Sequence, residues 1–234
     1  MLRFIFLFSF VLLALLSSSG FAGVVFNGSF ETGDFSGWGT ASLNTSIGDP
    51  LTVRPDGYTP SYRTSANESF FTTSATDGNF SATHGFDGLG PGNITIFQDI
   101  GVVDSLTNQL LFDYRAAWDL VRFGSLGDLD RVLNLDVYQA GDFSNQLSSY
   151  EVFRLTADTI NIDTGNLTET VDLSAFDGQA IRISFDAFVP DNLSGPAFFQ
   201  LDNVRLAAGV PEPSSLALLG VILAPVVLSR RRIG

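Results

Sequence analysis

The chain has 234 residues, no cysteine, and 25 acidic against 12 basic residues, which gives a formal net charge of −13 at pH 7. The lack of cysteine excludes disulfides and thiolate chemistry, and the negative charge disfavours a phosphate backbone, so we expect no nucleic-acid partner. An acidic surface instead favours solubility and divalent cations.

The N-terminal residues predict export from the cytoplasm. Arg3 precedes an apolar run over residues 4–16, and small residues follow, including Gly20 and Ala22. A short basic start, an apolar core too short to span a bilayer easily, and small residues at the end form a secretory signal. We therefore predict a signal peptide over residues 1–22, cleaved after Ala22.

Residues 23–208 are predicted to form one all-β domain. Apolar residues recur at every second position in short runs bounded by Gly, Asp, Asn and Pro, the alternation that half-buried strands require. The clearest runs cover residues 94–100, 109–117, 131–139, 150–155, 168–173, 180–189 and 197–206, with a single helical turn expected at 174–178. This spacing favours an antiparallel two-sheet sandwich, with a jelly roll preferred over an immunoglobulin-like order.

The two ends of this domain resemble galactose-binding-like jelly rolls, a group that includes many carbohydrate-binding modules. The resemblance rests on residues 26–31, which read FNGSFE, on Gly37-Trp38, and on residues 199–204, which read FQLDNV. It implies that Glu31 and Asp202 meet at a structural Ca²⁺ ion, with backbone carbonyls or water completing the six to eight oxygen ligands. The alternative is that Glu31 caps a turn and Asp202 lies on a solvent-exposed strand face.

Carbohydrate binding would need an exposed aromatic ring among polar groups. Trp118, at a strand end before a loop, is the predicted sugar-binding residue because it could face outward, whereas Trp38 is expected to pack in the core or in a turn. Tyr58 and Tyr62 are further candidates. A second acidic loop, residues 124–130, lacks the length of an EF-hand and is expected to be a solvated turn.

Catalysis is not predicted. His84 is the only histidine and no Gly-X-Ser-X-Gly motif is present, so a catalytic triad or zinc site would have to be built around His84. One alternative is a polysaccharide hydrolase, which would place two carboxylates about 5 to 9 Å apart in a cleft. The other is a structural component of the extracellular matrix with no small ligand.

The C-terminal residues 209–234 contain three ordered elements. Two prolines flank an acid in Pro211-Glu212-Pro213, an apolar stretch follows over residues 216–228, and the segment closes on Arg230, Arg231 and Arg232. The apolar stretch of about 15 residues is at the lower limit for a membrane span, so a transient anchor awaiting processing fits as well as a permanent one.

This tail resembles that of the PEP-CTERM proteins of Gram-negative bacteria. The resemblance implies sorting and processing by an exosortase, with transient anchoring in the inner membrane and a final place in the cell envelope or outside the cell. Seven Asn-X-Ser/Thr sequons suggest a eukaryotic lipid anchor instead, but such signals end in their hydrophobic tail and not in arginines. We predict a non-catalytic, exported module that binds extracellular polysaccharide.

Overall fold

The structure is a computed structural model that describes residues 23–43, 50–60, 71–85, 90–118, 129–156, 162–190 and 197–209. The predicted signal peptide, the sorting residues of the tail, Tyr62 and residues 124–128 of the acidic loop lie outside these ranges. Within them, no helix has the length and apolar character needed to cross a membrane.

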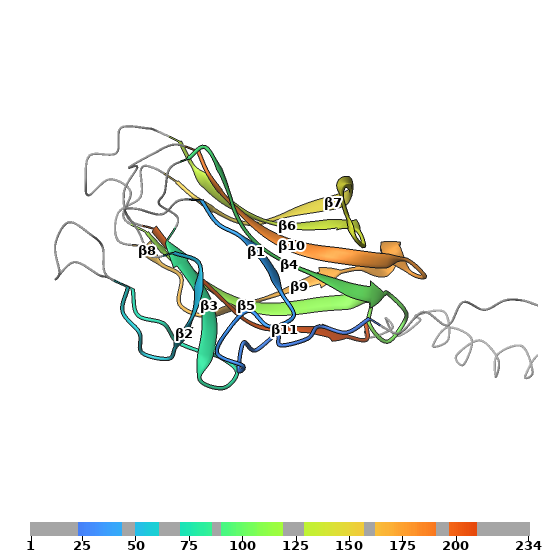
Figure 1. Cartoon of the computed structure of the whole chain (residues 1–234), viewed down its shortest axis with the longest axis horizontal. Coiled ribbons are helices and arrows are strands. Elements are labelled where there is room, and N and C mark those ends of the chain that lie inside the picture. Colours follow the sequence, from blue (N-terminus) through green and yellow to red (C-terminus); the bar gives the residue numbers. More distant parts are fainter. Residues whose placement is uncertain are drawn as a thin grey trace, which may run out of the picture.

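Two antiparallel sheets form the two layers seen in Figure 1. The first sheet has the spatial order β1 (Gly39–Ala41), β4 (Gly92–Val102), β10 (Ala180–Val189), β6 (Arg131–Gln139) and β7 (Asp142–Leu155). The second has the order β2 (Thr52–Pro55), β3 (Phe80–Gly85), β11 (Ala197–Ala207), β5 (Gln109–Trp118) and β8 (Ile162–Asp163), and β9 (Leu167–Asp172) also pairs with β5. The predicted all-β sandwich is therefore confirmed.

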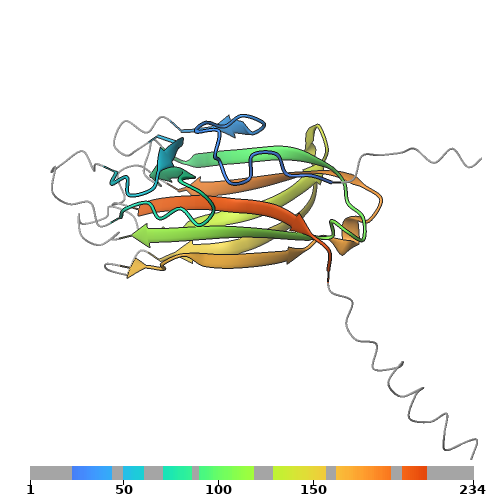
Figure 2. The same ribbon diagram turned by 90° about the horizontal axis from the view of Figure 1, so that it is seen from below.

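The longer strands follow the connectivity of a jelly roll. In chain order, β3, β5, β9 and β11 belong to the second sheet, while β4, β6, β7 and β10 belong to the first, so the chain crosses repeatedly between the layers. Figure 2 shows β5 and β11 side by side along the second sheet, where their residues pair from Ala197 with Trp118 to Ala207 with Gln109. The first and last strands of the eight, β3 and β11, are neighbours.

Alternate residues of the strands fill the space between the sheets. In β10 the side chains of Ile181, Ile183 and Phe185 are buried in one core cluster, as the period of two predicts. The Phe185 ring makes an edge contact with Phe112 of the opposite sheet, with ring centroids 4.9 Å apart. Trp38 packs against the same ring at 6.4 Å, which confirms its predicted place in the core.

The prediction missed the strands β1, β2, β3 and β8 and the first half of β7, and the physical reason is clear for β7 and β3. β7 begins at Asp142 and not near residue 150, because its polar first half is an exposed edge strand that pairs with β6 across the turn at Ala140–Gly141. β3 has no alternation because it is buried almost throughout, including Ser81 and Thr83. The helical turn expected at 174–178 is confirmed as a 3₁₀ turn, η1 (Ser174–Phe176).

Candidate functional site

The outer face of the five-stranded sheet carries a row of polar residues at its centre. The pairing register places Asp186 of β10 between Thr95 of β4 and Asn134 of β6, and places Ser184 beside Asp136. Residues paired across strands share one face of a sheet, and Phe185, which separates Ser184 from Asp186, points into the core. We refer to Thr95, Asp136, Ser184 and Asp186 as the polar floor.

The members of the polar floor are buried although they point away from the core. Thr95, Asp136, Ser184 and Asp186 are each exposed by 8% or less. The hydroxyl groups of Thr95 and Ser184 donate to the two carboxylate oxygens of Asp186, each at 2.6 Å. Buried polar groups are rare on an outer sheet face, so this floor is a candidate binding surface.

Asp136 contributes a carboxylate with an unmet hydrogen-bonding need. The Tyr138 hydroxyl donates to its Oδ2 at 3.4 Å, while Oδ1 is buried and receives no hydrogen bond from the described residues. Asp136 is the cross-strand partner of Ser184, whose hydroxyl donates to Asp186, so the two carboxyl groups are diagonal neighbours on this face. Burial raises the pKa of Asp186 and the Asp136 charge acts in the same direction, against the lowering effect of the Ser184 and Thr95 hydroxyls.

An aromatic cluster, Phe97, Tyr138 and Phe143, stands beside the polar floor. The Phe143 ring contacts Phe97 at 4.8 Å and Tyr138 at 5.1 Å between ring centroids, both nearly edge-on. The Arg182 guanidinium lies 4.9 Å from the Phe97 centroid and 4.3 Å from that of Phe143. Phe143 remains 45% exposed, so the cluster presents an apolar ring surface next to a polar floor.

Gly39 allows the Phe97 ring to lie across the neighbouring strand. The two residues are directly paired between β1 and β4, and a Cβ atom at position 39 would overlap the ring. The glycine therefore holds the aromatic ring down over the sheet, a recognised means of filling the space beside a strand glycine.

The opposite rim of this face is formed by an ion-pair network. Arg154 of β7 pairs with Glu151 at 2.5 Å and with Asp130 at 3.4 Å. On the aromatic side, Arg182 forms a two-pronged ion pair with Asp99, with distances of 2.8 and 3.0 Å. These two arginines are thus engaged by carboxylates and do not neutralise the polar floor.

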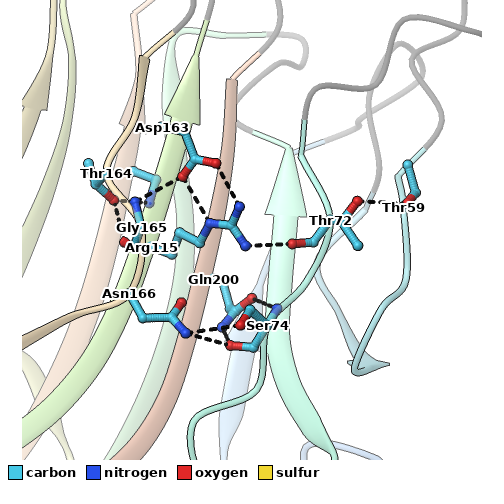
Figure 3. A network of polar contacts seen from close by, with 10 residues as sticks. Thr59, Thr72, Ser74, Arg115, Asp163, Thr164, Gly165, Asn166 and Gln200 are labelled. Carbon is cyan, nitrogen blue, oxygen red and sulfur yellow. Dashed lines mark hydrogen bonds and ion pairs between the residues drawn. The ribbon is translucent and has the colours of Figure 1, made fainter.

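The outer face of the second sheet is instead covered by the chain itself. Residues 71–79 lie along it, held by a polar network that Figure 3 shows in close view. Gln200 of β11 accepts from the Ser74 backbone N–H at 2.8 Å and donates to its carbonyl at 2.7 Å. Arg115 of β5 donates to the Thr72 carbonyl and forms an ion pair with Asp163 at 2.6 Å. This face is therefore structural.

Glu31 and Asp202, the predicted calcium ligands, both bind the same turn before β3. Asp202 is fully buried, and its Oδ2 accepts from the backbone N–H groups of Thr76 at 2.7 Å and Asp77 at 3.1 Å. Glu31 accepts from the backbone N–H groups of Asn79 and Phe80 at 2.7 and 2.8 Å.

Backbone donors thus occupy both oxygens of Asp202 and the Oε1 atom of Glu31. The described residues contain no group of three or more His, Cys, Asp or Glu side chains placed to hold a metal. Burial raises the pKa of Asp202 to about 6, against the opposing effect of the N–H donors. Calcium binding stays a prediction. The alternative that placed Asp202 on a solvent-exposed strand face is wrong, because the side chain is buried.

Trp118 does not form the exposed ring that sugar binding was expected to use. Its side chain is only 8% exposed, and its indole N–H has no hydrogen-bond partner among the described residues. It continues the inward series of β5, in which Phe112, Tyr114 and Ala116 belong to the core. The strand alternation outweighs the nearness of the following loop.

The hydrolase alternative would need two carboxylates about 5 to 9 Å apart in a cleft. In the polar floor, Asp136 and Asp186 lie on adjacent strands, and both oxygens of Asp186 accept hydrogen bonds from the Thr95 and Ser184 hydroxyls. His84 is fully buried against the Phe199 ring, with ring centroids 5.1 Å apart, so it is closed to a substrate. We find no positive sign of catalysis in the part of the chain that the structure describes.

Comparison with known proteins gives structural similarity only. No protein-family model matches the chain, and no curated protein sequence is significantly similar to it. It is similar in structure to TmCBM61, solved in complex with beta-1,4-galactotriose, with 15% identity and a TM-score of 0.46 over 80% of this chain and 99% of that one.

A family 11 carbohydrate-binding module from Clostridium thermocellum, solved with a beta-1,3-1,4-mixed-linked tetrasaccharide, has 11% identity and a TM-score of 0.42 over 81% of this chain and 97% of its own. A cyclase from Fischerella sp. TAU has 17% identity and a TM-score of 0.46 over 83% of this chain and 100% of its own. Binding modules and an enzyme thus occur together among the structures that this chain resembles.

Proposed function

We propose that the protein is a non-catalytic module that binds polysaccharide on the outer face of its five-stranded sheet. The observation that carries this proposal is the polar floor, whose buried hydroxyl and carboxylate groups lie beside the exposed aromatic cluster. A sugar ring presents hydroxyls at its edge and C–H groups on its faces, so it matches polar acceptors next to a flat apolar surface.

The extended shape of the face suits a chain polymer better than a small enclosed ligand. The polar floor spans β4, β10 and β6, and the ion-pair network of Arg154 continues on β7. On the second sheet, residues 71–79 bind the outward side chains of Gln200 in β11 and Arg115 in β5. A purely structural matrix protein would have no reason to keep buried polar groups on an outer face.

We expect Phe143→Ala to weaken binding of the preferred polysaccharide by about tenfold, equivalent to ~1.4 kcal/mol, because the exposed ring is lost. Binding would be measured by affinity electrophoresis of the full chain against soluble xylan, galactan, mixed-linkage glucan and chitosan. Leu106→Ala is the control, since Leu106 is 71% exposed but lies in the β4–β5 connection away from this face. Equal binding by both variants would contradict the proposed site, and no binding to any polymer would contradict the function.

We also propose that the protein is exported by its N-terminal signal and sorted through its tail by an exosortase to the cell envelope or the extracellular space. This rests on the sequence of the two termini, with Arg3 and the apolar run at one end and Pro211-Glu212-Pro213 and Arg230 at the other.

Mass spectrometry of the protein recovered from its host is expected to find a first residue at Gly23 and no peptide from the apolar stretch 216–228. The matched control is the same chain with Glu212→Ala, which leaves the apolar stretch and the arginines intact. If the control is processed in the same way as the parent, the tail is not read as a PEP-CTERM signal.

A further inference from the structure

The hydroxyl groups of the polar floor already donate their hydrogens to carboxylates of the same floor. A hydroxyl group has a single hydrogen, and those of Thr95 and Ser184 are directed at Asp186 at 2.6 Å. The Tyr138 hydroxyl is directed at Asp136. What these residues offer to a ligand is therefore a set of acceptor lone pairs and not a set of donors.

One of the carboxylate acceptors also lacks a donor. The Oδ1 atom of Asp136 is buried and receives no hydrogen bond from the described residues, and Asp136 is the cross-strand partner of Ser184, whose hydroxyl donates to Asp186. A buried carboxylate oxygen without a donor is costly, and a second carboxylate nearby adds repulsion. A proton shared by the two groups or a cationic donor from a ligand would relieve both costs.

The two arginines at the rims of this face do not supply that cation. Arg182 is held by Asp99 in a two-pronged ion pair and is enclosed by the Phe97 and Phe143 rings. Arg154 is held by Glu151 and Asp130 on the other rim. A ligand that carries its own positive charge meets an uncompensated carboxylate pair, whereas a ligand that carries carboxylates is repelled by it.

We infer that the polar floor selects an amino-bearing glycan, whose ammonium group binds between the carboxylates of Asp136 and Asp186 while the sugar ring lies against the aromatic cluster. This inference rests on the proposed polysaccharide-binding function and names its ligand class. An ammonium group has three donors, enough to bind the Asp136 carboxylate and an Asp186 oxygen together. Neutral sugars supply hydroxyl donors without charge, and uronic acids supply the wrong charge.

The test uses oligomers of glucosamine and of N-acetylglucosamine of equal length, which share one backbone and differ at the nitrogen, a charged ammonium group in the first and a neutral acetamide in the second. Titration calorimetry of the full chain would be run at low ionic strength and about pH 6, so that the amines are protonated and screening is weak. We expect the glucosamine oligomer to bind at least about tenfold more tightly than the acetylated one, because its hydrogen bonds are charge-assisted. An oligogalacturonate of the same length should show no binding.

Asp136→Asn keeps the shape of the side chain and removes its charge, so it is expected to abolish the preference for the glucosamine oligomer over the acetylated one. Asp177→Asn is the matched control, because Asp177 is an exposed acid in the turn after η1. Melting temperatures of both variants show whether the fold is intact.

Equal affinities for the two oligomers in the parent protein would overturn the inference and leave the proposed function standing. The same conclusion would follow if the protein bound other polysaccharides but neither of the two oligomers. Failure to bind any polymer would overturn the proposed function as well. A preference that survives Asp136→Asn unchanged would show that the carboxylate pair does not select the amine.

Discussion

The free energy of unfolding is expected to fall by about 3 kcal/mol between pH 7 and pH 4 through His84 alone. His84 lies in β3 on the inner side of its sheet, and burial lowers its pKa to about 3, against about 6.5 in an unfolded chain. Below pH 6.5 the unfolded chain therefore binds a proton that the folded chain excludes. The contribution of His84 to the free energy of unfolding is therefore fully present above about pH 6.5 and is lost as the pH falls toward the pKa of the folded state.

Urea unfolding of the parent and of His84→Gln at pH 7 and pH 4 measures this contribution. The carboxylates titrate in both proteins, so they cancel when the two changes are compared. The parent should lose about 3 kcal/mol more than the variant over this interval. If both lose the same amount, the His84 ring is protonated in the folded state and its burial does not make stability depend on pH.

Asp202→Ala is expected to lower the free energy of unfolding by about 3 kcal/mol, because three backbone N–H groups lose their acceptor, each costing about 1 kcal/mol or more. These groups belong to Thr76, Asp77 and Asn203, at 2.7, 3.1 and 2.7 Å from the carboxylate. The change would be measured by urea unfolding of the full chain in the presence of a chelator.

Unfolding in the presence of calcium distinguishes two roles of Asp202, as an acceptor that anchors the turn before β3 and as the predicted metal ligand. If the ion binds at Glu31 and Asp202, calcium at 100 times its dissociation constant adds about 2.7 kcal/mol to the parent and nothing to Asp202→Ala. Asp56→Ala is the control, since Asp56 holds the same segment through the Ala75 N–H at 2.9 Å without belonging to the predicted ligand pair. If calcium does not stabilise the parent, no ion binds there in the folded state.

The period of two in the apolar residues predicted most of the strands, because in a half-buried strand every second side chain points into the core and is apolar. Residues 180–189 show this most clearly, since Ile181, Ile183 and Phe185 are in the core and Arg182 and Asp186 are on the outer face. The same rule, applied to the series ending at Trp118, places that ring inside the sandwich. The alternation of apolar residues in β5 already indicated that Trp118 points inward. The prediction that Trp118 faces outward relied on the following loop instead.

Segments without alternation were the ones the sequence could not reveal. β3 is buried at every residue after its first, including the polar Ser81 and Thr83, so its sequence lacks the alternation of a half-buried strand. The first half of β7 is a solvated edge, where backbone pairing with β6 replaces side-chain burial as the reason for the strand. In both cases the decisive contact comes from another part of the chain.

The sequence by itself determined the sandwich, the inward residues and the two carboxylates of the terminal motifs, Glu31 and Asp202, because each depends on local patterns or short motifs. Only the tertiary structure decided that both carboxylates bind the turn before β3, and that Asp136 meets Asp186. Asp136 and Asp186 lie on strands far apart in the chain, and their meeting depends on the antiparallel register of β6 and β10. Register is set by packing and turns across the whole domain, so a shift of one residue would have turned one carboxylate into the core.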